Sequence, residues 1–394
     1  MVIWLTILGE HSEMKYFKYI SLFFFLVCVV LSVYSKVEVD EFWSYTGVLH
    51  STASQIIQYA QFKSANNQLF NSLYIHFLQK AGVKSAFMYR LLSLSSFIIY
   101  SFYYYRIIIY KTADIPFAGR RKASYAVIYL FPYILTFFVY FSMSRGYALA
   151  IATFMGSLYY FMKIRDRYEL KDGLLFVFLG ILSSLSIFSF AYVFAAMLLM
   201  GFAKNYKDIF HRSVKSIVMN VLVFMVLLFI FYYIYDKGAI INSNDKSIDG
   251  GNNLLQSGLI SSIFSFLALQ NIALQNYATT HSLFIVMRDA VIVTIIPVAI
   301  IFYRKATIAS EHLLLVLSIC LMVISHLVFG SKYPYGRALS GEILLLYLPF
   351  VTYSLNIQEK KEWLLYNAHF FVLTAIGLYG ICSLFLFAFL YPHS

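Results

Sequence analysis

Acidic residues are scarce in this chain, which has 18 Asp and Glu against 30 Lys and Arg in 394 residues. Charged residues of both signs make up only 12% of the sequence, whereas hydrophobic residues make up 61%. The mean hydropathy is +0.74. These values exclude an ordinary soluble globular domain, in which about a quarter of the residues are charged. They are typical of a protein that is largely embedded in a membrane.

Cysteine is also rare, and the three residues of this type, Cys28, Cys320 and Cys382, all fall inside apolar segments. Their spacing excludes a disulfide framework and a cysteine metal site. A Gly-rich phosphate loop is missing, and the basic loops are too short for a nucleotide-binding domain. No cleavable signal peptide is expected at the amino end, and translation starts at Met1 or at Met14.

Repeated apolar runs of about 17–25 residues predict transmembrane helices. The run 173–203 is too long for one helix and rich in Ser at its middle, so two short spans are expected, with a tight turn near 186–190. The predicted fold is an all-α polytopic membrane protein with about eleven transmembrane helices, formed by residues 1–394 as one integral membrane domain. The spans are 19–34, 86–108, 124–140, 146–162, the two within 173–203, 217–235, 282–303, 313–329, 338–355 and 366–390.

Most Lys and Arg residues cluster in short loops between these runs. The positive-inside rule therefore places the loops in the cytoplasm, with the amino end inside and the carboxyl end outside, and explains the net charge of +12 without nucleic acid. Two long outer segments remain, residues 35–85 and 236–281. Each holds a short apolar run, 69–78 and 259–269, which is too short to span and is expected to lie along the membrane surface.

Four polar groups collect on the predicted outer face, although they come from distant parts of the chain. An acidic pair after the first span is the most unusual of them in so apolar a sequence. The groups are Asp40-Glu41 with Glu38, Asn66-Asn67-Gln68, Ser144-Arg145-Gly146-Tyr147, and the segment from Lys332 to Arg337.

This combination of residues suits glycosyl transfer. A carboxylate can take a proton from an acceptor hydroxyl as the oxygen attacks an anomeric carbon. Arginine binds phosphate through two hydrogen bonds, and tyrosine can stack on a sugar face. Simpler interpretations stay open: Asp40-Glu41 as a solvated helix boundary, Arg145 and Arg337 as interfacial anchors, and Asn66-Asn67 as an ordinary turn.

Five elements occur in the order and spacing of a known group of enzymes. They are Asp40-Glu41, the stretch 66–73, Gly82 followed by Arg90-Leu91, the stretch 144–150, and Tyr335-Gly336-Arg337. Together they resemble the GT-C superfamily of polytopic glycosyltransferases, which includes the protein O-mannosyltransferases and the lipid A aminoarabinose transferase. The similarity is closest to the bacterial, family-39-like branch. Gln68 stands where that family commonly has His.

The resemblance implies a polyprenyl-phosphate-linked sugar donor that is used on the outer side of the membrane. It implies that Asp40 is the catalytic base and that Glu41 supports it or binds substrate. The remaining roles implied are donor phosphate binding by Arg145, Arg337 and Lys332, and substrate binding by Asn66, Asn67, Gln68, Tyr147 and Tyr335.

The expected partners are membrane lipids, the lipid-linked donor and a glycan, lipid or protein acceptor, without nucleic acid. The expected location is a bacterial inner membrane with the site facing the periplasm. No cofactor is expected, although Asp40-Glu41 could hold one divalent metal ion; turnover that is sensitive to a chelator would favour the metal.

Two other functions compete with this one. A polymerase of O-antigen type tends to place key arginines in a late outer loop, but the segment 236–281 has no arginine and only Lys237 and Lys246 as bases. A transporter or flippase of lipid-linked sugars favours charges buried at membrane depth and internal repeats. Neither feature is clear in this sequence, because the charged residues sit near the ends of the predicted helices.

Overall fold

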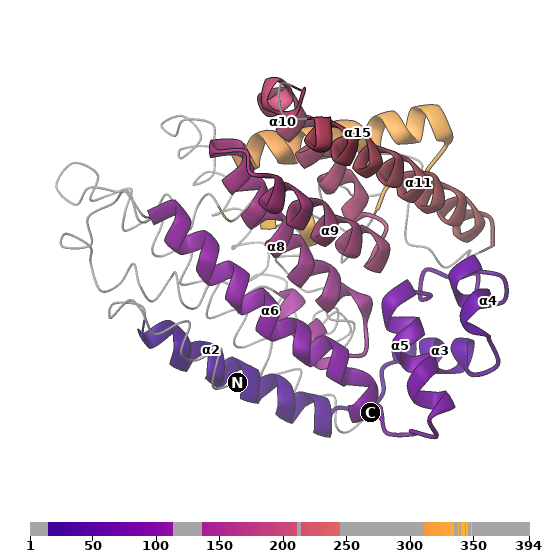
Figure 1. Cartoon of the computed structure of the whole chain (residues 1–394). Coiled ribbons are helices and arrows are strands. Elements are labelled where there is room, and N and C mark those ends of the chain that lie inside the picture. Colours follow the sequence, from indigo (N-terminus) through magenta and orange to yellow (C-terminus); the bar gives the residue numbers. More distant parts are fainter. Residues whose placement is uncertain are drawn as a thin grey trace, which may run out of the picture.

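The computed structural model describes residues 15–112, 136–210, 214–244, 310–334 and scattered positions from 338 to 348. The described part is helical and contains no strand, as Figure 1 shows. Its elements are α2 (Lys15–Tyr34), α3 (Val39–Leu49), α4 (Ala53–Gln58), α5 (Leu69–Lys80), α6 (Ala86–Thr112), the 3₁₀ helix η3 (Thr136–Ser142), α8 (Gly146–Asp166), α9 (Leu170–Ser186), α10 (Phe190–Phe210), α11 (Val214–Asn244) and α15 (Ser310–Phe329).

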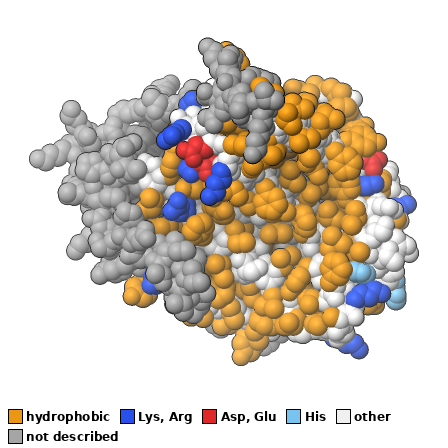
Figure 2. All heavy atoms as spheres, viewed as in Figure 1, with side chains coloured by type: hydrophobic (Ala, Val, Ile, Leu, Met, Phe, Trp, Pro, Cys, Tyr) orange, Lys and Arg blue, Asp and Glu red, His pale blue; other side chains and the backbone are white. Residues whose placement is uncertain are grey.

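Five of these helices are long and apolar enough to cross a membrane. They are α2, α6, α8, α11 and α15, and α10 contains a shorter apolar helix. Hydrophobic side chains cover much of the described surface visible in Figure 2. Such a surface is stable against lipid rather than water, so these helices are those of an integral membrane protein.

Most predicted boundaries in the described part agree with these helices to within a turn or two. The Ser-rich run 173–203 does divide into two helices, α9 and α10, with a turn at residues 187–189. In contrast, α11 continues past its predicted end at Tyr235 to Asn244. The predicted spans 282–303 and 366–390, most of 124–140, and parts of 338–355 lie outside the described residues, so eleven spans stay a prediction.

The helices meet at two opposite ends of the bundle. At one end, which we call the Asp40 end, α3, α4 and α5 pack together beyond the end of α2 and the start of α6 (Figure 1). At the other end, Lys111 near the end of α6 forms an ion pair with Glu311 at the start of α15. Lys163 of α8 pairs there with Asp172 of α9 at 2.5 Å. At this second end α6 and α8 finish, whereas α9 and α15 begin. These relative directions are those of the predicted topology.

Within the described spans, α8 is the most buried and α11 the most exposed. α8 packs against α6, α9 and α10, and Gly156 of α8 allows a close approach of two of them. Gly156 lies so close to Tyr103 of α6 and Leu179 of α9 that a Cβ there would be 2.7 and 2.8 Å from their side chains. Small residues at helix contacts are the usual means of close packing in membranes.

Gly180 of α9 tests this packing directly. A Cβ at this position would overlap the ring of Phe194 in α10, and that ring is buried and packed against Phe176 and Phe231. We expect Gly180→Ala to lower the free energy of unfolding by about 1–3 kcal/mol, the usual cost of overpacking. Thermal unfolding of the purified protein in detergent measures the change.

The matched control is Gly238→Ala, because Gly238 lies in α11 with open space around its Cβ position. There the substitution should leave stability unchanged or raise it by about 0.5–1 kcal/mol, since alanine is the better helix former. Equal unfolding temperatures for the two variants would contradict the close contact between α9 and α10.

Candidate functional site

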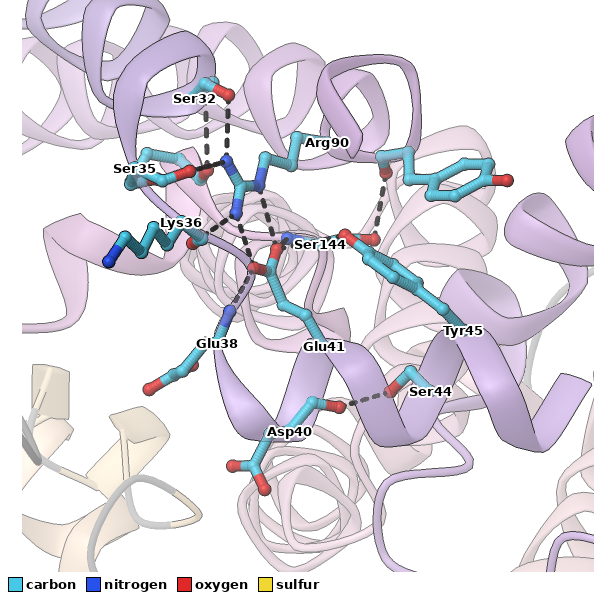
Figure 3. Close-up of polar contacts among 12 residues, drawn as sticks. Ser32, Ser35, Lys36, Glu38, Asp40, Glu41, Ser44, Tyr45, Arg90 and Ser144 are labelled. Atoms are coloured by element: carbon cyan, nitrogen blue, oxygen red, sulfur yellow. Dashed lines mark hydrogen bonds and ion pairs between the residues drawn. The ribbon is translucent and has the colours of Figure 1, made fainter. Parts of the chain in front are cut away.

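The acidic pair lies in the first turn of α3, just beyond the end of α2. The helix begins after Glu38, whose backbone N–H donates to Glu41 Oε2 at 3.0 Å. Negative charge is favoured there by the helix dipole. Because successive residues of a helix project roughly 100° apart, the two carboxylates point in different directions. Figure 3 shows Glu41 directed toward Arg90 and Asp40 directed away from Arg90.

Glu41 is fully buried and forms a two-pronged ion pair with Arg90 of α6. Arg90 Nη2 lies 2.6 Å from Glu41 Oε2 and Arg90 Nε lies 3.0 Å from Oε1. The two side chains are 0% and 1% exposed. Tyr45 Oη adds a further hydrogen bond to Oε1 at 3.3 Å, and burial together with this carboxylate raises the pKa of Tyr45, so the phenol stays neutral. Glu41 is therefore surrounded by protein donors.

Arg90 also binds the end of α2. Its Nη1 donates to the carbonyl of Ser32 at 2.9 Å and to that of Ser35 at 3.0 Å, and its Nη2 donates to the carbonyl of Lys36 at 3.0 Å (Figure 3). The last carbonyls of a helix have no partner within the helix. One guanidinium thus binds one carbonyl in the last turn of α2 and two carbonyls just after it, and connects the end of α2 to the start of α3.

The segment before α8 completes this arrangement. The backbone N–H of Ser144 donates to Glu41 Oε1 at 2.6 Å, and the next residue, Arg145, pairs with Asp40 through Nη1 and Oδ2 at 2.6 Å. Ser144 and Arg145 therefore bind Glu41 and Asp40 respectively. The Arg145 side chain is 1% exposed, whereas that of Asp40 is 17% exposed, so Asp40 is the member of the pair that a ligand can reach.

The Asn66-Asn67-Gln68 turn lies against the same pair, but its three residues act differently. Asn66 Nδ2 donates to Asp40 Oδ1 at 3.3 Å. Asn67 is buried, and its Nδ2 donates to the backbone carbonyls of Ile56 and Phe62 at 3.0 and 3.2 Å, which gives it a role in shaping the loop. Gln68 is buried at the N-cap of α5, and its Oε1 accepts the backbone N–H of Gly146.

Tyr147 is buried beside Arg145, whose guanidinium carbon lies 5.6 Å from the centre of the Tyr147 ring. The ring also packs on Tyr140 at a centroid distance of 5.0 Å. Lys332 follows α15 and is half-buried. Arg337 and Tyr335 lie outside the described residues.

The structure therefore brings together Asp40, Arg145 and the turn at 66–68 from the predicted set. Sequence reasoning assigned no role to Arg90, although a charged residue near the start of an apolar span was a signal that it is paired. It also assigned no role to Asn71, which lies within the stretch 66–73 and whose Nδ2 donates to the Ser144 carbonyl at 3.0 Å. The described residues contain no group of three or more His, Cys, Asp and Glu that could hold a metal ion.

Comparisons with protein-family models, with curated proteins and with solved structures found no match to this chain.

Proposed function

We propose that this protein is a membrane glycosyltransferase that moves a sugar from a polyprenyl-phosphate donor to an acceptor hydroxyl, with Asp40 as the general base. The observation that carries the proposal is the pairing of a partly exposed carboxylate, Asp40, with a buried arginine, Arg145, at 2.6 Å. A base and a phosphate ligand are the two groups that this reaction requires at one place.

In this reaction the acceptor oxygen attacks the anomeric carbon, and the bond from that carbon to the phosphate oxygen breaks. The hydroxyl proton passes to the carboxylate of Asp40, and the electron pair of the broken bond leaves on the polyprenyl phosphate. Arg145 stabilises the charge that develops on the phosphate. A single displacement of this kind inverts the configuration at the anomeric carbon.

Glu41 receives a different role in this proposal. A base needs a free lone pair within reach of substrate, but the oxygens of Glu41 accept hydrogen bonds from Arg90, Ser144 and Glu38. We therefore treat Glu41 as the residue that positions α3 and, through it, Asp40. Its burial argues against a direct contact with substrate.

The surroundings of Asp40 suit a lipid-linked donor. Phe42 and Trp43 follow the acidic pair on α3, and each is 56% exposed. Aromatic side chains of this kind favour the boundary between lipid and water. A donor that diffuses in the membrane with its phosphate at that boundary would meet Asp40 and Arg145 without entering water.

The GT-C resemblance remains part of the proposal, with a bacterial inner membrane as the location and the Asp40 end facing the periplasm. The partners proposed are the polyprenyl-phosphate sugar and a glycan, lipid or protein acceptor. The predicted phosphate ligands Lys332 and Arg337 and the predicted substrate ligand Tyr335 keep those roles within the proposal.

The test adds a labelled polyprenyl-phosphate sugar and a mixture of candidate acceptors to the purified full-length protein in detergent. Release of free polyprenyl phosphate together with label on an acceptor is expected. Binding of the labelled lipid without turnover would contradict the enzymatic proposal, since the detergent preparation contains the whole chain.

One observation favours a transporter of lipid-linked sugars as the second candidate. Glu342 is 1% exposed, and its Oε1 accepts a hydrogen bond from Ser318 Oγ in the middle of α15 at 2.9 Å. Carboxyl groups at membrane depth often belong to transport pathways. The assay measures movement of the labelled lipid-linked sugar across the membrane of vesicles that contain the purified protein. Movement that is lost in Glu342→Gln and kept in Asp40→Asn would favour transport over transfer.

A further inference from the structure

Gln68 ends in an amide that uses only one of its two polar atoms. Its Oε1 accepts the N–H of Gly146, but its Nε2 is buried and has no hydrogen-bond partner among the described residues. The whole side chain is 3% exposed. A buried donor without a partner costs free energy in the folded state, so this nitrogen calls for a ligand or a structural explanation.

The position of this nitrogen is closely defined. Oε1 and Nε2 share one carbon atom, so the hydrogen bond from Gly146 holds both at the first turn of α8. A Cβ on Gly146 would lie 2.9 Å from the Cβ of Gln68 and 3.1 Å from the carbonyl oxygen of Ser186. The start of α8 therefore packs directly against the Gln68 side chain and the end of α9.

The groups nearby favour an anion. Arg145 is the N-cap residue of α8 and immediately precedes Gly146, and the amino end of a long helix has a partial positive charge. Asn66, two residues before Gln68, bonds to Asp40, the partner of Arg145. The free donor of Gln68, the guanidinium of Arg145 and the start of α8 therefore occupy one small region.

We infer that Gln68 Nε2 and Arg145 form the two arms of a monophosphate site at the amino end of α8. The inference rests on the proposed function, because it identifies the phosphate of the lipid-linked donor as the group bound there. Gln68 would donate to one phosphate oxygen and Arg145 to another, which places the phosphate beside the Asp40 carboxylate that receives the acceptor proton.

The experiment measures binding alone, by calorimetric titration of the full-length protein in detergent with farnesyl phosphate and with farnesol. Wild-type protein should bind the phosphate more tightly than the alcohol. Gln68→Glu keeps an oxygen for the N–H of Gly146 but replaces the free donor by a negative charge. Its affinity for farnesyl phosphate should fall about tenfold or more, as for a lost hydrogen bond to a charged group, while its affinity for farnesol stays unchanged.

Gln68→Met separates the lost donor from charge repulsion, because it removes the amide without adding charge. It should also lose affinity for farnesyl phosphate, by about tenfold, although its unfolding temperature should fall because Gly146 loses an acceptor. Wild-type affinity for farnesyl phosphate in a folded Gln68→Met variant, or equal binding of phosphate and alcohol by the wild-type protein, would overturn the inference.

The result is independent of glycosyl transfer. If the protein transfers no sugar but its affinity for farnesyl phosphate depends on Gln68, the phosphate site is supported and the proposed function is wrong. If the protein transfers sugar but neither Gln68 variant changes the affinity for farnesyl phosphate, the proposed function stands and the phosphate site at Gln68 is wrong.

Discussion

Asp40→Asn should lose nearly all glycosyl transfer while it still folds, with a lower unfolding temperature because the buried Arg145 guanidinium loses its charged partner. Asparagine has the same shape and keeps an Oδ1 acceptor for Asn66, which donates to that atom at 3.3 Å. It cannot accept the proton of an acceptor hydroxyl, and general base catalysis contributes about 10²–10⁴-fold to a rate. The expected result is a fall of that size in kcat, measured as release of free polyprenyl phosphate from the labelled donor.

The control for this variant is Asp236→Asn. Asp236 lies on α11, where its carboxylate pairs with the neighbouring Lys237 at 2.7 Å and is 44% exposed. It removes one negative charge from an exposed site, so kcat should not change. The unfolding transition of Asp40→Asn shows whether the variant is folded. If the folded variant transferred sugar at the wild-type rate, Asp40 would not be the general base.

The spans were predictable because each depends on a local property of the chain. An apolar run of sufficient length needs a helix in lipid, where every backbone group must find a partner, and this rule predicted α2, α6, α8 and α15. The turn at 187–189 was predictable for a similar reason, since Ser residues cluster where the run becomes too long. The end of α11 was not, because its polar continuation to Asn244 departs from the apolar pattern.

The position of Asp40 could be predicted, but the division of labour within the acidic pair could not. The sequence places Asp40 and Glu41 side by side and gives no reason to treat one as buried. That difference arises from Arg90, which is 49 residues away in the chain, and from the backbone N–H of Ser144, which is 103 residues away. Contacts of this separation depend on how the helices pack, and pattern along the chain does not reveal them.

The same limit applies to the Asn66-Asn67-Gln68 turn. All three residues were grouped because they are polar and adjacent, and the GT-C resemblance implied substrate binding for each of them. In the structure Asn66 faces Asp40, Asn67 bonds to the backbone of its own loop, and Gln68 contacts the start of α8. Adjacent residues in a turn point in different directions, so composition identified the region without separating the three roles.

Arg90→Met should have the largest effect on stability. It removes the guanidinium that, among the described residues, pairs with the Glu41 carboxylate, which is 0% exposed. It also removes the donors for the carbonyls of Ser32, Ser35 and Lys36. Breaking a buried ion pair by removing one partner costs about 3–5 kcal/mol. The expected result is a large fall in the unfolding temperature in detergent or a loss of folded protein.

A second substitution separates the ion pair from the other bonds of Arg90. In the double variant Arg90→Met with Glu41→Gln, no unpaired charge remains buried, so part of the lost stability should return relative to Arg90→Met alone. The recovery should be incomplete, because the carbonyls at the end of α2 still lack donors. If the double variant were no more stable than Arg90→Met, the cost would come from the lost helix end rather than from Glu41. The ion pair would then not be what holds α3, and the register of Asp40 against Arg145 would depend on the Ser144 contact instead.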